Sequence, residues 1–201
     1  MKVFKFGGAS VKDAGAVKNI SGILKSFSGE KLLVVISAMG KTTNALEKVV
    51  NSYFTNDGQA VAHLEEVKQY HRKIMIELFK SASDQIFDEV NNIFVEIEWV
   101  LDEQPSKGYA FAYDQIVSAG ELISTKIVSA YLRESGVDNS WLDARDCIQT
   151  DNNYREGNVN WDLTGQLAVR STEALFEKTG IIITPPPPDE LMTVLARRGP
   201  H

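Results

Sequence analysis

Two short apolar runs, each followed at once by a loop of small and polar residues, limit the fold of this chain more than any other feature. Residues 3–6 are apolar apart from Lys5 and end at a glycine pair, and residues 32–36 form an uninterrupted apolar run that ends at Ser37. Such a continuous run is typical of a strand buried on both faces, and strands of this kind form parallel sheets covered by helices. The chain is therefore expected to contain repeated β-loop-α units.

The rest of the chain continues this alternation. Apolar residues at helical or strand spacing predict helices over residues 11–27, 45–54, 111–135 and 162–178, and strands over 139–142 and 181–183. Two more helical stretches, 59–80 and 84–103, predict a helical insertion at about 59–104. The order predicts an α/β fold with three αβα layers around a mostly parallel central sheet.

A run of four prolines at residues 185–188 ends this pattern. Proline lacks a backbone donor and fixes its own φ, so regular hydrogen-bonded structure stops there. We therefore expect one lobe over residues 1–184, which contains the insertion, and an atypical proline-rich tail over 185–201 that lacks order.

Composition excludes several classes of function. A net charge of -6 comes with no basic stripe, which argues against a nucleic-acid partner, and no run approaches the roughly 20 apolar residues of a membrane span. A cytoplasmic location is the default expectation. Cys147 has no disulfide partner and is expected to be a buried small hydrophobe, and because His63, His71 and His201 are scattered, we assign no metal ligand.

The first loop has the composition of a phosphate site. Lys5 lies in the first predicted strand, Gly7 and Gly8 follow, and Ser10 stands where a helix is expected to start. Glycines let backbone amides approach oxygen atoms closely, a helix N-terminus favours negative charge, and a strand-borne ammonium group is a fixed counter-charge. Alternatively, the glycines only turn the chain and Lys5 ends in solvent at the edge of the sheet.

The second loop, residues 37–44, follows the strand predicted at 32–36. In parallel α/β sheets, ligands bind outside the carboxyl ends of strands, so both loops are expected to face one crevice. Thr42, Thr43 and Asn44 offer hydroxyl and amide groups to a polar substrate, or they cap the helix that follows.

Glu121 belongs to a polar stripe at helical spacing, together with Asp114, Ser118 and Thr125. Such a stripe is usually a solvated face. The neighbouring Gly120 costs a helix roughly 0.5 to 1 kcal/mol relative to alanine and invites an explanation by packing or by a ligand. Further along, the cluster Asp143–Asp146 is either part of a site or a salt-bridged, capping turn.

Taken together, residues 5–10 (Lys-Phe-Gly-Gly-Ala-Ser), 37–44 (Ser-Ala-Met-Gly-Lys-Thr-Thr-Asn) and 120–124 (Gly-Glu-Leu-Ile-Ser) resemble the aspartokinases of the amino-acid kinase superfamily in order and spacing. The resemblance runs from residue 1 to about residue 184. It implies phosphoryl transfer from ATP, bound with Mg²⁺, to the side-chain carboxylate of L-aspartate. The product would be 4-phospho-L-aspartate, the first intermediate of lysine, threonine and methionine biosynthesis.

The same resemblance implies a role for each matched residue. Lys5 would stabilise charge on the transferring phosphoryl group, and Thr43 and Glu121 would hold the amino acid, Glu121 through its α-ammonium group. The residues implied to surround the ATP phosphates are Gly7, Gly8, Ser10 and Ser37. A homodimer is left open as an assembly.

The chain departs from the aspartokinase pattern at two places. Ala9 stands where the family usually has threonine, and the sequence after Thr184 no longer follows the family. We therefore expect a truncated or altered fragment with little or no activity alone. Two alternatives remain: a related carboxylate kinase acting on glutamate or acetylglutamate, and a non-catalytic binding or regulatory module.

Overall fold

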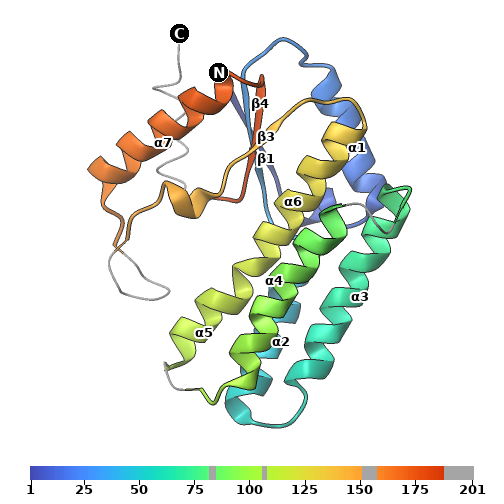
Figure 1. Ribbon diagram of the computed structural model, residues 1–201, viewed down its shortest axis with the longest axis vertical. Helices are drawn as coiled ribbons and strands as arrows, with labels where there is room; N and C mark the ends of the chain where they lie inside the picture. The colour runs from blue at the N-terminus through green and yellow to red at the C-terminus, as the bar shows by residue number, and fades with distance from the viewer. Residues whose placement is uncertain (82–84, 106–107, 151–157, 188–201) are drawn as a thin grey trace.

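The computed structural model describes residues 1–81, 85–105, 108–150 and 158–187 (Figure 1). Strands and helices alternate along the first and last parts of this chain, and helices alone occupy the middle. In chain order the elements are β1 (Lys2–Phe6), the 3₁₀ turn η1 (Gly8–Val11), α1 (Ala14–Lys25), β2 (Leu32–Ile36), α2 (Thr42–Thr55), α3 (Ala60–Leu78), α4 (Gln85–Asp102), α5 (Gly108–Val117), α6 (Ala119–Glu134), β3 (Ser140–Trp141), the 3₁₀ turn η2 (Ala144–Asp146), α7 (Trp161–Phe176) and β4 (Ile181–Thr184).

The described strands form one parallel sheet in the order β1-β2-β4-β3. Phe6 pairs with Ile36, and Val35 pairs with Thr184, so the last residues of these strands lie at the same edge. The prediction of a mostly parallel central sheet is confirmed. Because all strands point the same way, the loops that follow them meet at that edge.

Helices cover both faces of the sheet, as the apolar run of β2 predicts. Leu32, Val34 and Ile36 pack into the larger core with α1 and α6, whereas Leu33 packs into a smaller core beneath α7. All five residues of β2 are 0% exposed, and burial of each such side chain contributes about 1.5–3 kcal/mol.

Cys147 lies in the smaller core at 2% exposure, where burial raises the pKa of its thiol. It is the buried small hydrophobe that the sequence predicts.

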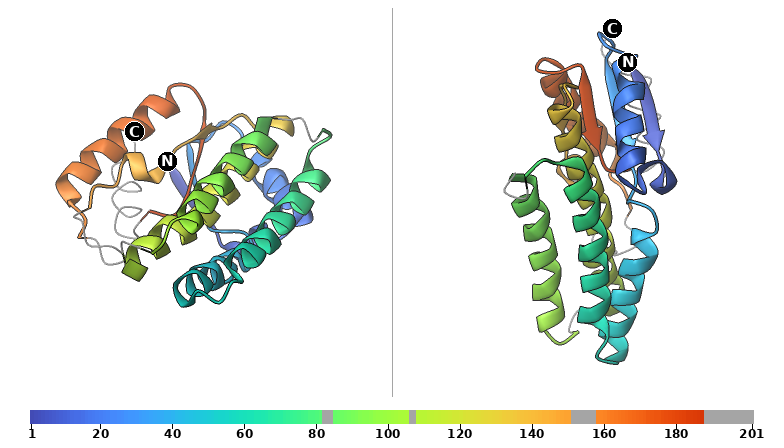
Figure 2. Two further views of the ribbon diagram at one scale, coloured as in Figure 1. Left: turned by 60° about the horizontal axis from the view of Figure 1, so that its bottom comes forward. Right: turned by 90° about the vertical axis from the view of Figure 1, so that its right-hand side faces the viewer.

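The helices α2, α3, α4 and α5 form an elongated group that extends beyond one edge of the sheet, and α6 runs from this group back along the strands (Figures 1 and 2). The predicted helical stretches 59–80 and 84–103 correspond to α3 and α4. Their apolar faces belong to the same core as α1 and α6. The inserted helices are therefore packed into the lobe and do not hang from it.

Three predicted helix boundaries are wrong. The helix expected over residues 45–54 begins three residues earlier, at Thr42, so Thr42, Thr43 and Asn44 lie inside α2 and Lys41 occupies the N-cap position. The helix expected from residue 11 begins at Ala14, because Asp13 caps it by accepting a hydrogen bond from the backbone N of Ala16 at 2.8 Å. Ser10 accordingly lies in η1, outside α1. The helix expected over 111–135 is interrupted at Ser118, whose Oγ donates to the carbonyl O of Asp114 at 2.6 Å. Such side-chain bonding to the preceding turn is associated with bent helices.

The tail predicted over 185–201 falls largely outside the described residues. Residues 185–187 are described, and they have no regular secondary structure. The prediction for residues 188–201 lies outside the part of the chain that the structure describes.

Candidate active site

The two loops that the sequence predicts separately lie against each other at the carboxyl edge of the sheet. The backbone N of Gly40 donates to the carbonyl O of Gly8 at 3.0 Å, and the backbone N of Ser37 donates to the carbonyl O of Phe6 at 3.0 Å. These bonds continue the pairing of β1 with β2 past the ends of the strands. The first and second loops thus form one surface.

The two glycines of the first loop serve different purposes. A Cβ atom at Gly8 would lie 2.7 Å from the carbonyl O of Ala38 and 2.8 Å from that of Gly40, so only glycine allows the loops to approach this closely. Gly7 has an ordinary φ of -74°, and a Cβ atom there would meet nothing within 4 Å among the described residues. The close packing of the two loops therefore requires glycine at position 8, whereas the open space at position 7 leaves room for a ligand oxygen.

Lys5 lies on β1, an edge strand, with an exposed side chain. Its charge nevertheless reaches the site, because it lowers the pKa of Glu121. Two predicted site residues that are 116 positions apart in the chain therefore lie within electrostatic reach of each other.

Ser10 and Ser37 flank these loops. Ser10 is exposed in η1, and its backbone N donates to the carbonyl O of Gly7 at 2.8 Å. The carbonyl O of Ser37 accepts a hydrogen bond from Ser124 Oγ at 2.8 Å, which ties the middle of α6 to the second loop. The sequence predicts no role for the Ser124 side chain itself, because its partner is 87 residues away and no local pattern marks the contact.

Glu121 occupies the first turn of α6, where burial raises the pKa of its carboxyl to about 7 and the nearby Lys5 opposes that rise. The residue lies between two cavities. One, of about 250 Å³, is lined by Thr43, Tyr113, Asp114, Val117, Ser118 and Glu121. The other, of about 220 Å³, is lined by Ser118, Glu121, Leu122, Ala144, Arg145, Ile148, Pro185 and Pro186.

The position of Glu121 depends on the neighbouring glycine. A Cβ atom at Gly120 would lie 3.0 Å from Thr42 Cγ2 and 3.1 Å from Leu46 Cδ1, so glycine lets α6 pack closely on α2. Packing therefore explains Gly120. The close approach also places Thr43, on the first turn of α2, at the wall of the same cavity as Glu121.

Arg145 brings a positive charge to the second cavity. Its Nη2 donates to Asp143 Oδ2 at 2.6 Å and its Nε to Asp143 Oδ1 at 3.0 Å, while the same carboxylate caps η2 by accepting from the backbone N of Arg145 at 3.0 Å. This is the salt-bridged, capping turn that the sequence allows. Arg145 also lines the cavity beside Glu121, so the two readings of this cluster are compatible.

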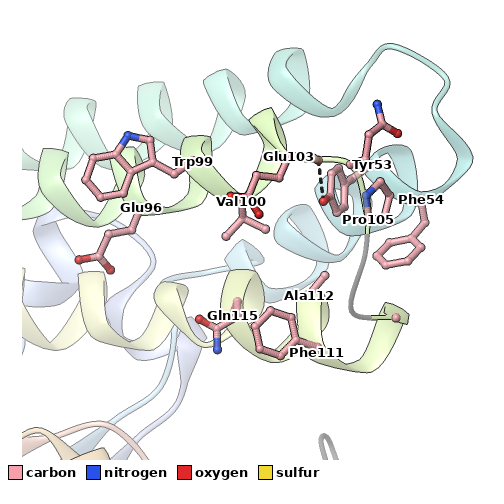
Figure 3. Close-up of a pocket in the computed structure, with 12 residues that line it drawn as sticks. Tyr53, Phe54, Glu96, Trp99, Val100, Glu103, Pro105, Phe111, Ala112 and Gln115 are labelled. Atoms are coloured by element: carbon pink, nitrogen blue, oxygen red, sulfur yellow. Dashed lines mark hydrogen bonds between the residues drawn. The ribbon is translucent and has the colours of Figure 1, made fainter.

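A separate cleft of about 260 Å³ lies in the helical region, lined by residues of α2, α4 and α5 that include Tyr53, Trp99 and Phe111 (Figure 3). None of the site residues predicted from the sequence lines it. The described residues contain no group of three or more His, Cys, Asp or Glu side chains that could hold a metal ion. Within the same ranges, no helix is long and apolar enough to cross a membrane.

Comparison with known proteins gives consistent matches. The family model described as the amino acid kinase family matches residues 1–185. Aspartokinase 2, chloroplastic, from Arabidopsis thaliana is 34% identical over 145 residues, which are 67% of this chain and 25% of that protein. The bifunctional aspartokinase/homoserine dehydrogenase 1, chloroplastic, of the same plant is 28% identical over 152 residues, 73% of this chain and 16% of that protein.

A solved structure has the same fold. Aspartokinase III from E. coli, in complex with aspartate and ADP in its R-state, superposes with a TM-score of 0.80 at 26% identity, covering 92% of this chain and 40% of that one. The chain thus spans a quarter or less of the length of the two plant relatives.

Proposed function

This chain belongs to the amino acid kinase family, and from that premise we propose that its site serves phosphoryl transfer from ATP to the side-chain carboxylate of L-aspartate. The resemblance of the chain to the aspartokinases is confirmed by the plant relatives and the bacterial structure. That bacterial enzyme was solved with aspartate and ADP, which supports the same pair of ligands here. The product would be 4-phospho-L-aspartate, at the entry to lysine, threonine and methionine biosynthesis.

The observation that carries the proposal is that the charge of Lys5, on the strand before the paired glycine loops, acts on the partly buried carboxyl of Glu121 beside two cavities. Phosphoryl transfer requires positioning and charge stabilisation more than covalent chemistry by the protein. Lys5 supplies a positive charge for the transferring group, and the open face at Gly7 admits a phosphate oxygen. We propose that Gly8, Ser10 and Ser37 complete the surface around the phosphates of ATP, which brings its own Mg²⁺.

The cavities beside Glu121 suit a small amino acid. At neutral pH the carboxyl of Glu121 is close to its pKa of about 7, so a ligand ammonium group would favour its ionised form. Thr43 offers a hydroxyl group from the opposite helix, and Arg145 offers a guanidinium group that can pair with a carboxylate. The nucleophile needs no general base, because an aspartate side chain with a pKa of about 3.9 is ionised at pH 7.

Calorimetric titration with L-aspartate, in the presence and absence of MgATP, tests this function together with an ADP-release assay. We expect L-aspartate to bind, and Glu121→Gln to weaken binding about tenfold or more, since a hydrogen bond to a charged group contributes about 1.5–3 kcal/mol. The matched control is Glu134→Gln, the same change in an exposed residue at the end of α6.

A substrate panel of L-aspartate, L-glutamate and acetylglutamate distinguishes the rival kinases. Preference for glutamate or acetylglutamate would replace the proposed substrate. If wild type and Glu121→Gln bind L-aspartate with equal affinity, Glu121 does not pair with the α-ammonium group of the substrate.

A further inference from the structure

One turn of α3, which belongs to the helical insertion, contacts the second loop and the residue just after the first loop. The hydroxyl of Tyr70 donates to the carbonyl O of Lys12 at 2.6 Å, just after η1 of the first loop. The same hydroxyl lies against Gly40 of the second loop, where a Cβ atom would be only 2.5 Å from it. Gly40 also has a φ of +55°, a conformation that glycine adopts without strain.

The close contacts continue from Gly40 to the first loop. Gly40 donates its backbone N–H to the carbonyl O of Gly8, and a Cβ atom at Gly8 would lie 2.8 Å from the carbonyl O of Gly40. The packing therefore leaves no room for an added methyl group between Tyr70 and Gly40 or between Gly40 and Gly8. A shift of Tyr70 would be passed directly to the surface proposed to bind phosphate.

The next residue, His71, reaches the second loop from its helical side. Its side chain is 0% exposed, and Nδ1 donates to the carbonyl O of Val67 at 2.8 Å, which leaves Nε2 as the acceptor. Nε2 lies 3.4 Å from Thr42 Oγ1, and that hydroxyl donates to the carbonyl O of Met39 at 2.6 Å. The ring also packs edge-on against Tyr70, with centroids 5.1 Å apart.

We infer that Tyr70 and His71 are positioning residues, which hold the first and second loops in the mutual arrangement that binds phosphate. They act through Gly40 and Thr42, since it is the loops that would meet the ligand. The inference rests on the proposed function for what the loops bind. The mechanical link between α3 and the loops stands on the contacts alone.

Backbone amide hydrogen exchange, followed by NMR, tests the link without any ligand. Tyr70→Phe removes one hydroxyl, and we expect the Gly40 amide to exchange about 2- to 10-fold faster, as the loss of one neutral hydrogen bond predicts. The matched control is Tyr53→Phe, which removes a hydroxyl that donates to the carbonyl O of Glu103 at 2.9 Å (Figure 3). Tyr53 lies near the C-terminal end of α2, and the second loop leads into the N-terminal end of that helix. The amide of Val34 in β2 reports global stability. Unchanged protection at Gly40, or equal acceleration in both variants, would overturn the inference.

Two substitutions of His71 separate positioning from core filling. Glutamine can place a polar atom near the former Nε2, and asparagine near the former Nδ1. We expect His71→Gln to keep Gly40 protection closer to wild type than His71→Asn does, because only glutamine keeps a polar atom in contact with the Thr42 hydroxyl. Equal effects of the two variants on Gly40 would limit His71 to a structural role.

Titration with MgATP connects the link to function. Tyr70→Phe should raise the dissociation constant for MgATP about as much as it accelerates exchange at Gly40, while Tyr53→Phe leaves the constant unchanged. If the wild-type chain binds no MgATP, the proposed function fails while the exchange data still decide the link. Faster exchange at Gly40 with an unchanged MgATP affinity would contradict the positioning role.

Discussion

Glu121 and His71 show two uses of the same physical effect in neighbouring regions of the molecule. Burial raises the pKa of Glu121 to about 7 and lowers that of His71 to about 4, so both side chains are pushed toward their neutral forms. The surroundings differ. His71 is fully enclosed and donates from Nδ1 to the carbonyl O of Val67, with Nε2 3.4 Å from Thr42 Oγ1, whereas Glu121 adjoins two cavities and has its pKa lowered by the charge of Lys5.

The comparison shows that a displaced pKa alone does not identify a site. Displacement beside an open cavity and an opposite charge favours ligand chemistry, while displacement inside a hydrogen-bonded core favours support. The region around Glu121 is therefore the candidate site, and the region around His71 is its scaffold.

The largest effect is expected from Lys5→Ala. In a full-length enzyme that carries this segment, turnover of MgATP and L-aspartate should fall about 100-fold or more, because the charge facing the transferring group is lost. Calorimetric binding of MgATP provides a second readout. The matched control is Lys2→Ala, on the same strand, which removes an exposed ion pair with Glu30 at 2.7 Å. If Lys5→Ala keeps the turnover and the MgATP affinity of the wild type, Lys5 does not stabilise the transferring phosphoryl group.

The two displaced groups should give opposite pH dependences of stability. Glu121 is held protonated, so its contribution is present below its ordinary pKa of 4.5 and is lost as the pH rises through about 7. His71 is held neutral, so its contribution is present above 6.5 and is lost as the pH falls through about 4. Each contributes at most about 3 kcal/mol, and between pH 4.5 and 6.5 they oppose each other.

Urea unfolding of single variants separates the two contributions. In Glu121→Gln, the free energy of unfolding should fall more steeply than in wild type as the pH drops from 6.5 to 4.5. The reason is that the loss of the His71 contribution is no longer offset by the gain from protonation of Glu121. In His71→Gln, the free energy of unfolding should decrease more steeply than in wild type as the pH rises from 4.5 to 7. Parallel pH profiles for wild type and both variants would show that neither group is displaced as described.

Alanine substitutions at the glycine pair should separate folding from ligand access. Gly8→Ala should reduce the free energy of unfolding by about 1–3 kcal/mol, because its Cβ meets two carbonyl oxygens. Gly7→Ala is the matched control and should change stability by no more than about 0.5 kcal/mol. If Gly7→Ala also leaves MgATP affinity intact, the open space at Gly7 does not admit a phosphate.

The smallest effect is expected from Thr43→Val. Loss of one neutral hydrogen bond should weaken L-aspartate binding about 2- to 10-fold without changing stability. Thr55→Val, at the other end of α2, is the control for the same substitution outside the cavity. Calorimetry on both variants distinguishes a ligand contact at Thr43 from a surface position with no role.

Local patterns in the sequence predict much of this fold. The apolar run of β2 indicated a strand buried on both faces, and the glycine pair after β1 indicated a tight loop. Two of the helix-boundary errors lie where a polar side chain bonds to nearby backbone. Asp13 delays the start of α1, and Ser118 interrupts the helix before Glu121. Polar residues compete locally with helix hydrogen bonds in ways that apolar periodicity does not record.

Residue order is enough to nominate Lys5, Gly8 and Glu121, because each belongs to a short motif of chemically suited residues. Packing determines how they act together. Parallel strands gather their loops at one edge, Gly8 and Gly120 allow approaches too close for a side chain, and burial sets the pKa of Glu121. These properties arise from contacts between residues far apart in the chain, so they exist only in the folded structure, where the sheet and the helices pack together.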